Sequence, residues 1–193
     1  MDGEVKQRFM TTFKEVSAAF DETFRQIFAG GRAKLELTDP HDLLTTGVDI
    51  MAQPPGKKNQ HLNLLSGGER ALTAITLLFA ILKVRPVPFA ILDEPEAALD
   101  EVNVQRFANY LQRFGKEGPQ FIVITHRKGT MMGADVLYGV TMQESGVSKM
   151  ISVDVIDTLN DQEELEESEW DYLIFSAATK RKHRRVTTQL PHR

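Results

Sequence analysis

Ser66 and the two glycines after it stand immediately before a long apolar segment. Ser66 and Glu69 have the S-x-x-E spacing of a capping box, in which each side chain bonds the other residue's backbone. Capping alone does not call for Gly67 and Gly68, because a glycine in a helix costs about 1 kcal/mol relative to alanine. Glycines here let a ligand approach the backbone, where free N–H groups and the positive helix end attract an anion. The segment therefore predicts a phosphate-binding site on a helix cap.

Two carboxylates, Asp93 and Glu94, follow the continuous apolar run of residues 89–92. Such a run is typical of a parallel strand covered on both faces, and the carboxyl ends of such strands bind ligands. One carboxylate there can hold Mg²⁺, and the next can position and deprotonate a water molecule. An isolated Asp-Glu pair often only marks the end of a strand. Pro95 and the Glu-Ala-Ala-Leu-Asp segment of residues 96–100 favour the functional interpretation.

His126 follows a second apolar run, residues 121–125, and an amphipathic helix is expected between the two runs. Strand, helix and strand in this order form a βαβ unit with parallel strands. If the strands are neighbours, His126 lies beside Asp93 and Glu94. A lone histidine is usually a surface or core residue, but one at this position could hydrogen-bond a terminal phosphate.

The sequence lacks the loop that would hold a nucleotide. A phosphate cradle requires the pattern G-x-x-x-x-G-K-[ST]. The one candidate, Gly56-Lys57-Lys58, fails because position 51 is Met and Lys58 stands where Ser or Thr should be. The chain therefore has elements for magnesium, a base and a phosphate contact, and we expect the cradle on another polypeptide or segment.

The remaining elements that must position these residues are clear from apolar spacing. In residues 5–28 the large apolar residues recur at steps of three and four, which predicts a helix that ends at Gly30-Gly31. This helix is either packed on the core or the end of a coiled coil. Short strands are expected at 33–37 and 47–52. The helix at 67–83 is apolar nearly all round and should be buried. Residues 136–142 and 147–155 predict a hairpin.

Bulk composition limits the function classes. The 193-residue chain has no cysteine, which excludes disulfides and thiolate sites, and its net charge of −4 gives no overall basic footprint for nucleic acid. No run approaches the roughly 18 apolar residues of a membrane span, and no secretory layout is visible at the start. A cytoplasmic protein is expected.

After residue 155, acidic residues 161–169 and basic residues 180–185 predict a disordered or loosely attached tail.

Four segments together resemble the C-terminal head segment of bacterial structural-maintenance-of-chromosomes (SMC) proteins: 54–58, 64–73, 89–100 and 120–129. The resemblance runs from about residue 13 to residue 155, and residues 139–153 are similar to the last hairpin of that family. It implies an α/β fold, the C-terminal lobe of an ABC-type ATPase head, with a largely parallel sheet flanked by helices. The implied parts are a coiled-coil stub (1–29), the lobe (30–156) and a charged tail (157–193). In the family, both ends of one long chain meet to form the head, which would account for the absent cradle.

The resemblance also implies roles for the residues that could contact ATP across a dimer of heads. Ser66, Gly67 and Gly68 would contact the γ-phosphate of ATP bound to a second head. Asp100, in the Ala-Leu-Asp segment, would reach across the dimer. Cofactors implied are ATP and Mg²⁺.

Asp93 would bind Mg²⁺, Glu94 would activate the attacking water, and His126 would be the switch residue. Pro95 departs from the family pattern, where a small aliphatic residue is usual, although Asp-Glu-Pro is common in transporter cassettes. The tail after about residue 156 does not resemble the family ending, so nothing is carried over to it.

The implied function is ATP-dependent head engagement and hydrolysis in chromosome condensation and segregation, at the nucleoid and away from any membrane. Implied partners are the N-terminal Walker A half of the same head, a second SMC head in a homodimer, a kleisin subunit and DNA. The chain alone would be inactive. One alternative is the head of another coiled-coil ABC ATPase that acts in DNA repair. A transporter subunit would carry its own cradle, and a degenerate scaffold would not keep Ser66, Asp93, Glu94 and His126.

Overall fold

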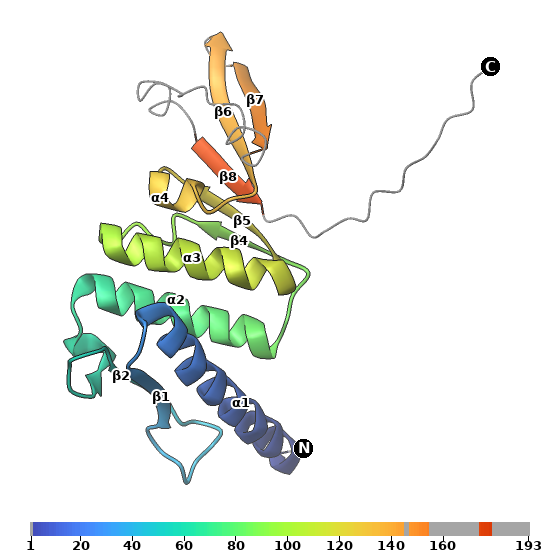
Figure 1. The fold of residues 1–193 in the computed structure, drawn as a ribbon. Helices are drawn as coiled ribbons and strands as arrows, with labels where there is room; N and C mark the ends of the chain where they lie inside the picture. The colour runs from blue at the N-terminus through green and yellow to red at the C-terminus, as the bar shows by residue number, and fades with distance from the viewer. Residues whose placement is uncertain (1, 145–146, 155–173, 179–193) are drawn as a thin grey trace.

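The computed structural model describes residues 2–144, 147–154 and 174–178 (Figure 1). Helix α1 (Asp2–Phe28) carries the predicted apolar stripe. The stripe is buried from Val16 onward, whereas Phe9 and Phe13 in the first half of the helix are only partly buried. The second half of α1 therefore belongs to the core and packs against α2 (Gly67–Val84) and β1 (Arg32–Leu37).

Helix α1 ends at Phe28, so Ala29 separates it from the predicted glycine pair. Ala29 adopts the left-handed conformation with φ 58°, and Gly30 N–H donates to Arg25 C=O at 2.9 Å. This is the six-to-one bond of a Schellman motif. Gly31 has φ 79°, and a Cβ there would collide with the backbone oxygen of Gln53. Glycine is thus required at 31 by both conformation and space.

A small antiparallel sheet follows α1, in the order β1-β2-β3. The two predicted strands are confirmed as β1 and β2 (Val48–Gln53), and β3 (Gln60–His61) is a third strand that the sequence did not predict. Two side chains of α1 fasten β1 by accepting its backbone N–H groups: Ser17 Oγ from Leu35 and Asp21 Oδ1 from Ala33. The 3-10 turn η1 (Leu62–Leu64) then leads into α2.

A larger, five-stranded sheet has the order β4-β5-β8-β6-β7. Its strands are β4 (Phe89–Asp93), β5 (Gln120–Thr125), β6 (Val136–Glu144), β7 (Val147–Asp154) and β8 (Ile174–Ala178). The predicted βαβ unit is confirmed, since β4 and β5 are parallel neighbours and helix α3 (Glu101–Glu117) connects them along the chain. The predicted hairpin is confirmed as β6 and β7, which pair antiparallel.

The expectation of a largely parallel sheet is wrong for the described strands. Only β4 and β5 are parallel, while β5–β8, β8–β6 and β6–β7 are antiparallel. The reason is local: after β5 and the short helix α4 (Lys128–Met131) the chain forms a hairpin, whose strands can only be antiparallel. Strand β8 lies within the segment predicted as a charged tail, and the rest of that segment is outside the described residues.

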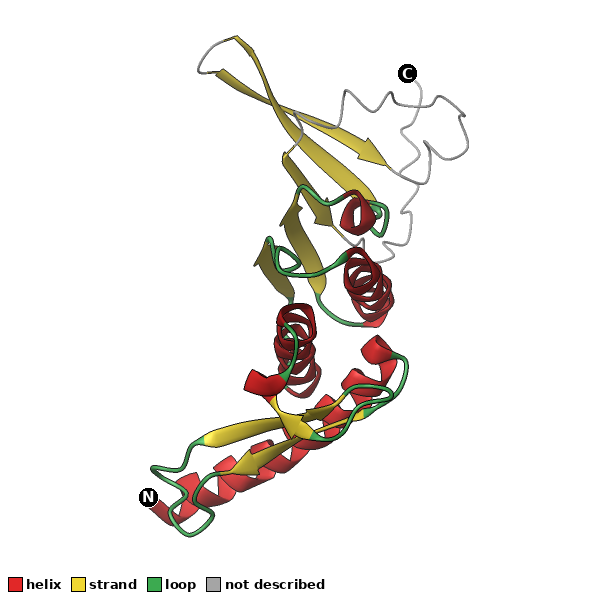
Figure 2. Cartoon of the chain, turned by 90° about the vertical axis from the view of Figure 1, so that its left-hand side faces the viewer, coloured by secondary structure: helices red, strands yellow, loops and turns green. Residues whose placement is uncertain are grey.

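Helices α3 and α4 cover one face of the larger sheet, and no described helix covers the other (Figure 2). Strand β4 reflects this: Leu92 is buried, but Phe89 and Ile91 are 54% and 60% exposed. The sequence predicted a strand covered on both faces. Helix α2 likewise departs from its predicted burial all round, because Leu78 and Ile81 are 39% and 42% exposed. The apolar sequences of β4 and α2 therefore predict that more of their surface is buried than the described residues bury.

The core between α2, α3 and β5 is aromatic. Phe79 of α2 is fully buried, with ring centroids of four neighbours 5.1–6.0 Å away: Phe107, Tyr110, Phe114 and Phe121. Pairs at these distances stabilise a core beyond the area that they bury. This cluster fixes α2 and α3 against the sheet, and so fixes the ends of those elements where the candidate site residues lie.

Candidate functional site

The carboxyl ends of β4 and β5 bring together three predicted residues. The parallel register pairs Asp93 with Ile124, so Glu94 and His126 both follow directly from the same edge of the sheet. His126 Nδ1 lies 3.2 Å from Glu94 Oε1. A carboxylate can only accept, so the ring N–H donates this bond and leaves Nε2 free to meet another group. Both side chains are more than half exposed, at 64% and 51%, so a ligand can reach them.

Glu94 has an unusual backbone conformation for a residue with a side chain. Its φ is 43°, in the left-handed region that costs energy outside glycine and is common at functional sites. Two backbone bonds hold it there: Glu94 N–H to Ile124 C=O at 2.9 Å and Ala97 N–H to Glu94 C=O at 3.1 Å. The turn therefore fixes the direction in which the Glu94 carboxylate leaves the strand.

A buried clamp, which the sequence analysis missed, joins the two strand ends. The hydroxyl of Thr125 donates a hydrogen bond to the fully buried Glu96 carboxylate and accepts one from Arg127 N–H at 3.0 Å. Arg127 Nη2 also donates to Leu99 C=O at 3.4 Å. His126 lies between the two residues that this clamp holds. The sequence contained no signal for this clamp, because the burial of Glu96, which makes a partner necessary, is visible only in the structure.

Asp93 is exposed at the end of β4, and its carboxylate forms no hydrogen bond or ion pair with the described part of the chain. Throughout the described residues, no group of three or more His, Cys, Asp and Glu side chains is placed to hold a metal ion. A single free carboxylate nevertheless fits Mg²⁺, which commonly takes one or two carboxylates and completes its shell with water and phosphate oxygens. Asp93 can thus supply one ligand to a metal that arrives with a phosphate group.

Ser66 caps helix α2 through the predicted capping box. Glu69 N–H donates to Ser66 Oγ at 3.4 Å, and Ser66 N–H donates to Glu69 Oε2 at 3.2 Å. The Ser66 hydroxyl also donates to Glu69 Oε2, at 2.9 Å. The serine is exposed and lies at the positive end of an 18-residue helix, where an anion is stabilised.

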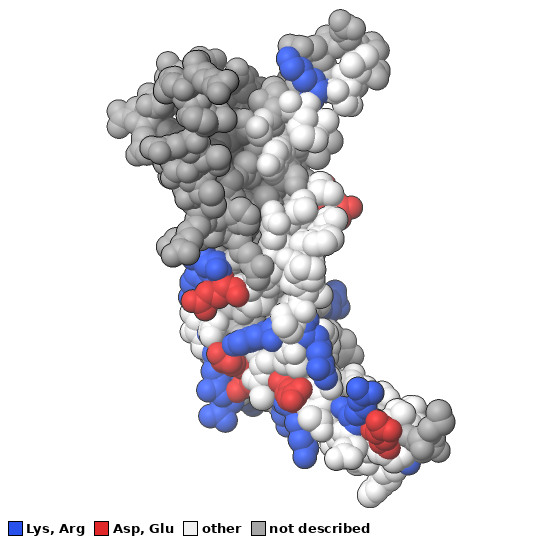
Figure 3. Space-filling view, turned by 90° about the vertical axis from the view of Figure 1, so that its right-hand side faces the viewer, with Lys and Arg blue, Asp and Glu red and all other residues white. Residues whose placement is uncertain are grey.

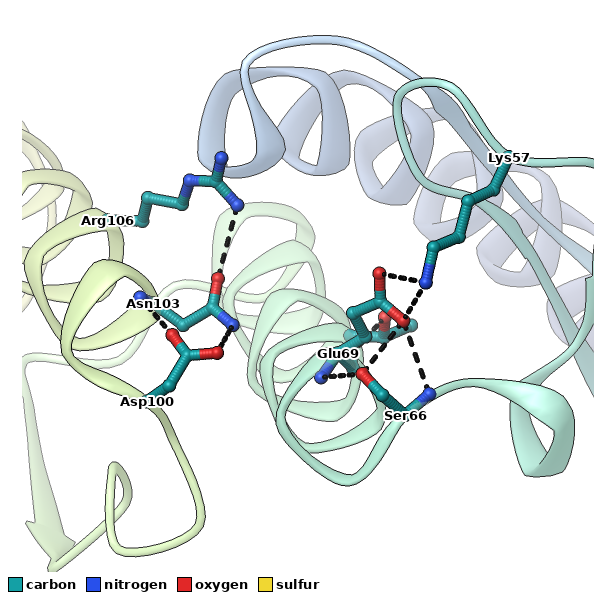
Figure 4. Close-up of polar contacts among 7 residues, drawn as sticks. Lys57, Ser66, Glu69, Asp100, Asn103 and Arg106 are labelled. Atoms are coloured by element: carbon teal, nitrogen blue, oxygen red, sulfur yellow. Dashed lines mark hydrogen bonds and ion pairs between the residues drawn. The ribbon is translucent and has the colours of Figure 1, made fainter.

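Lys57 completes this arrangement from the loop after β2 (Figure 4). Its Nζ lies 2.8 Å from Glu69 Oε1 and 2.9 Å from Oε2. Burial by itself would raise the pKa of Glu69, but the hydrogen bonds from Lys57 and Ser66 and the charge of Lys57 outweigh burial and lower it. Glu69 therefore carries its negative charge beside Ser66 at neutral pH.

Gly67 and Gly68, the two glycines that follow Ser66, differ in their surroundings. A Cβ on Gly67 would meet nothing within 4 Å, so the backbone there is open to a ligand. A Cβ on Gly68 would come within 3.4 Å of Asn103 Nδ2 and 3.6 Å of Asp100 Oδ2. Gly68 therefore lets the start of α2 lie close to the start of α3. Open backbone at Gly67 fits an incoming phosphate, whose oxygens would accept the free N–H groups of the first turn.

Asp100 is the N-cap of α3 and is held by a short chain of polar contacts (Figure 4). Its carboxylate accepts Asn103 N–H at 2.9 Å and Asn103 Nδ2 at 3.2 Å, and Asn103 Oδ1 accepts from Arg106 at 3.2 Å. A cleft of about 270 Å³ lies between these residues and the helix α2 cap, also lined by Pro54 and Pro55.

The predicted residues thus form two groups, one at the strand ends and one at the helix starts. Among the residues that the structure describes, no hydrogen bond or ion pair joins Asp93, Glu94 or His126 to Ser66 or Asp100. The contact of Lys57 with Glu69 was not predicted, because Lys57 was considered as part of a failed nucleotide cradle and of the segment 54–58 that resembles the SMC family. The Pro-Pro-Gly turn before it was the signal that could have indicated a fixed position.

None of the described helices has both the length and the apolar character needed to span a bilayer. Figure 3 shows Lys, Arg, Asp and Glu side chains intermingled over the lower part of one face, with few on its middle part. This mixture agrees with the net charge of −4.

Comparison with known proteins gives a family over most of the chain. The model of the RecF/RecN/SMC N terminal domain matches residues 4–149. The chromosome partition protein Smc of Bacillus subtilis is 69% identical over 158 residues, which make up 82% of this chain. Smc of Lactiplantibacillus plantarum is 67% identical over 162 residues, or 84% of this chain. The chain matches only 13% and 14% of the length of these two relatives.

Solved structures agree with the sequence relatives. An SMC head bound to the C-winged helix domain of ScpA has a TM-score of 0.72 and 42% identity, over 82% of this chain and 48% of that one. A structure from work on ATP-driven dimerization and DNA-stimulated activation of SMC ATPases has a TM-score of 0.71 and 39% identity, over 83% of this chain and 99% of that one. The chain therefore belongs to the RecF/RecN/SMC family and has the fold of an SMC ATPase head.

Proposed function

We propose that the chain is the C-terminal half of an SMC ATPase head, which acts in ATP-dependent head engagement and hydrolysis during chromosome condensation and segregation. It would supply the signature motif at Ser66–Gly68 and the Walker B carboxylates Asp93 and Glu94. It would also supply the loop that contains Asp100 and the switch residue His126. An N-terminal lobe would supply the nucleotide cradle that this sequence lacks. The chromosome partition relatives favour this role over that of a DNA-repair ATPase.

The observation that carries the proposal is the uncovered face of β4. Its sequence has the continuous apolar pattern of a strand covered on both faces, yet Phe89 and Ile91 are 54% and 60% exposed. Exposed apolar faces of this kind indicate a missing partner surface. Among the described residues β4 also pairs on one side only, with β5. A lobe that carries the cradle and adds to the sheet at β4 accounts for both features.

The two groups of site residues would then act on different nucleotides. Asp93, Glu94 and His126 would face ATP held in the cradle of their own head. Ser66, Gly67 and Asp100 would face ATP presented by a second head, because the sequence has no G-x-x-x-x-G-K-[ST] loop that could hold a nucleotide against them. Two identical heads would thus enclose two ATP molecules between them.

The residues at the strand ends have the properties that this chemistry requires. Mg²⁺ neutralises phosphate charge when bound, and Asp93 would supply one of its ligands. The Glu94 carboxylate would take a proton from the attacking water, and its fixed backbone supports a defined direction of attack. The Nδ1 bond to Glu94 orients the His126 ring, so that Nε2 would meet the terminal phosphate.

Further partners are proposed from the relatives. SMC head structures bound to ScpA support a kleisin subunit as a partner of this chain, and the work on SMC dimerization and DNA stimulation supports a second head and DNA. A location at the nucleoid follows from that role. The coiled-coil stub at 1–29, the lobe at 30–156 and the tail at 157–193 remain predictions.

Changing Glu94→Gln tests the proposal in a head reconstituted from this chain and the amino-terminal head segment of a homologous Smc protein. Hydrolysis should fall by roughly 10²–10⁴-fold, because the amide cannot accept a proton from water. ATP-dependent dimers should persist, and size-exclusion chromatography with ATP should detect them. Turnover at the wild-type rate would remove Glu94 from the mechanism.

Glu117→Gln is the matched control. Glu117 is an exposed glutamate at the end of α3, far along the helix from Asp100 at its start. The same change of charge there should leave both hydrolysis and dimers as in the wild type. A similar loss in both variants would mean that the effect is not specific to Glu94.

A further inference from the structure

Lys57 and Glu69 form an ion pair directly beside Ser66, and neither residue has a role in the function proposed above. The Glu69 carboxylate accepts from Lys57 at 2.8 and 2.9 Å, and from the hydroxyl and the N–H group of Ser66 at 2.9 and 3.2 Å. Its side chain is only 18% exposed, whereas Lys57 is 49% exposed. A largely enclosed carboxylate therefore lies one hydrogen bond away from the serine.

The backbone holds Lys57 in place. Lys57 N–H donates to Pro54 C=O at 3.0 Å, and Gly56 has φ 77°. These features, with Pro55 at the second position, define a type II turn. Gln53 Nε2 also donates to Lys57 C=O at 3.1 Å, which closes the turn from the end of β2. Proline fixes one torsion of this turn and so limits the positions that Lys57 can take.

The carboxylate creates two difficulties for a phosphate at Ser66. Its negative charge would repel the phosphate, and like charges in close contact weaken binding strongly. The Ser66 hydroxyl hydrogen is already donated to Glu69, so it must turn away from Glu69 to bond a phosphate oxygen. A largely enclosed carboxylate that loses a donor without replacement is destabilised.

We propose that Lys57 is a positioning residue for the phosphate contact of Ser66, and that it acts through Glu69. The ammonium group neutralises Glu69 where the phosphate arrives. It also keeps two contacts on the carboxylate when the serine hydroxyl turns toward the phosphate, so that Glu69 remains satisfied in both states. This inference rests on the proposed function, in which Ser66 contacts ATP held by a second head.

Lys57→Met in the reconstituted head tests the inference, with Lys58→Met as the matched control. Lys58 is the neighbouring exposed lysine, and no ion pair with Glu69 is formed by it in the described structure. We expect ATP-dependent dimerisation of the Lys57 variant to require about tenfold or more higher head concentration, because Glu69 is left unpaired beside the phosphate. The Lys58 variant should dimerise as the wild type does. Dimers are measured by light scattering with ATP in the Glu94→Gln background, which removes hydrolysis from the readout.

A second substitution separates the roles that Lys57 could have. If Lys57 acts through Glu69, adding Glu69→Gln to Lys57→Met removes the unpaired charge and should restore dimerisation to within about threefold of the wild type. If Lys57 instead contacts the phosphate directly, the double variant stays as weak as Lys57→Met, and the inference is wrong. Lys57→Arg should retain engagement, since it keeps the charge next to Glu69.

Two further measurements distinguish the remaining outcomes. Thermal unfolding of each variant without nucleotide tests whether Lys57 merely supports the fold: a dimerisation loss matched by a lower melting temperature, and not restored in the double variant, overturns the inference. Ser66→Arg should block engagement by steric clash. If that variant engages normally, the proposed function fails and this inference with it. If it is blocked while Lys57→Met engages like Lys58→Met, only the inference on Lys57 fails.

Discussion

Ser66 serves the fold as the cap of helix α2, and in the proposed function it would also contact a ligand. Its hydroxyl oxygen accepts the Glu69 N–H group and its hydrogen goes to the Glu69 carboxylate, so in this structure the side chain is fully used by the helix cap. The sequence could predict this capping box from the spacing of two residues. It could not predict Lys57, because that contact joins residues 12 apart through a turn whose geometry is not local to either helix end.

The pKa of Glu69 leads to a prediction at the same scale. Lys57 and Ser66 lower the pKa of the folded carboxyl, whereas an unfolded glutamate titrates at about pH 4.3. A lowered folded-state pKa contributes stability above the unfolded value, and this contribution is lost as the pH falls through the folded value. Wild type should therefore exceed Glu69→Gln in unfolding free energy at pH 7, and the difference should shrink below about pH 4.3.

Urea unfolding of the chain at several pH values between neutral and acid measures this difference. Glu117→Gln serves as the control, because Glu117 forms no hydrogen bond or ion pair with the described residues. A difference between wild type and Glu69→Gln that stays constant with pH would contradict the assignment of the Lys57 pairing as its source.

At the scale of elements, the sequence predicted well wherever a pattern was local and long. The stripe of α1, the βαβ unit and the β6–β7 hairpin follow from apolar spacing and turn residues. Pairing between distant segments was not accessible: β3 is two residues long, and β8 is inserted between β5 and β6 from a charged region. Strand order depends on contacts between segments that are distant in the sequence. The sequence therefore predicted more parallel pairing than the described strands have.

The aromatic cluster around Phe79 gives a prediction for these elements. Phe79→Ala should lower the free energy of unfolding by about 3–5 kcal/mol, since it leaves a cavity between four aromatic neighbours. Phe89→Ala is the matched control: Phe89 is 54% exposed, and its loss should cost less than about 1 kcal/mol. Denaturant unfolding by circular dichroism compares the two. Equal costs would show that the α2–α3 core is not the main stabilising contact.

At the scale of the whole molecule, the proposed function assigns parts of a nucleotide site to a sequence that lacks the G-x-x-x-x-G-K-[ST] cradle. Alone, it should show no specific Mg-ATP binding, because backbone amides and a lysine around the β- and γ-phosphates provide most of the affinity in such cradles. Isothermal titration calorimetry on the purified chain tests this, with the reconstituted head as the positive control. Micromolar binding by the chain alone would mean that the Gly56-Lys57-Lys58 segment has been misinterpreted.

The uncovered apolar face predicts that the chain alone associates with itself. Phe89 and Ile91 lie on one face of β4, and sedimentation should detect dimers or larger species at micromolar concentrations. Replacing both residues by serine should reduce this association. Val5→Ser is the control, because Val5 is an apolar residue that is 53% exposed in the first part of α1 and does not belong to β4. Association that survives the double change but is lost in the control would assign it to α1 instead.

The side of β4 that pairs with no described strand has a consequence for how a head could be assembled from separate pieces. If the nucleotide lobe adds to this edge, then joining it to the chain by a flexible linker converts a bimolecular association into an intramolecular one. A short linker corresponds to an effective concentration in the millimolar range. The two pieces then need to recognise each other only weakly, provided that the linker spans their ends. The apolar face of β4 would in that case determine where the second piece docks, while the linker determines how often it is docked.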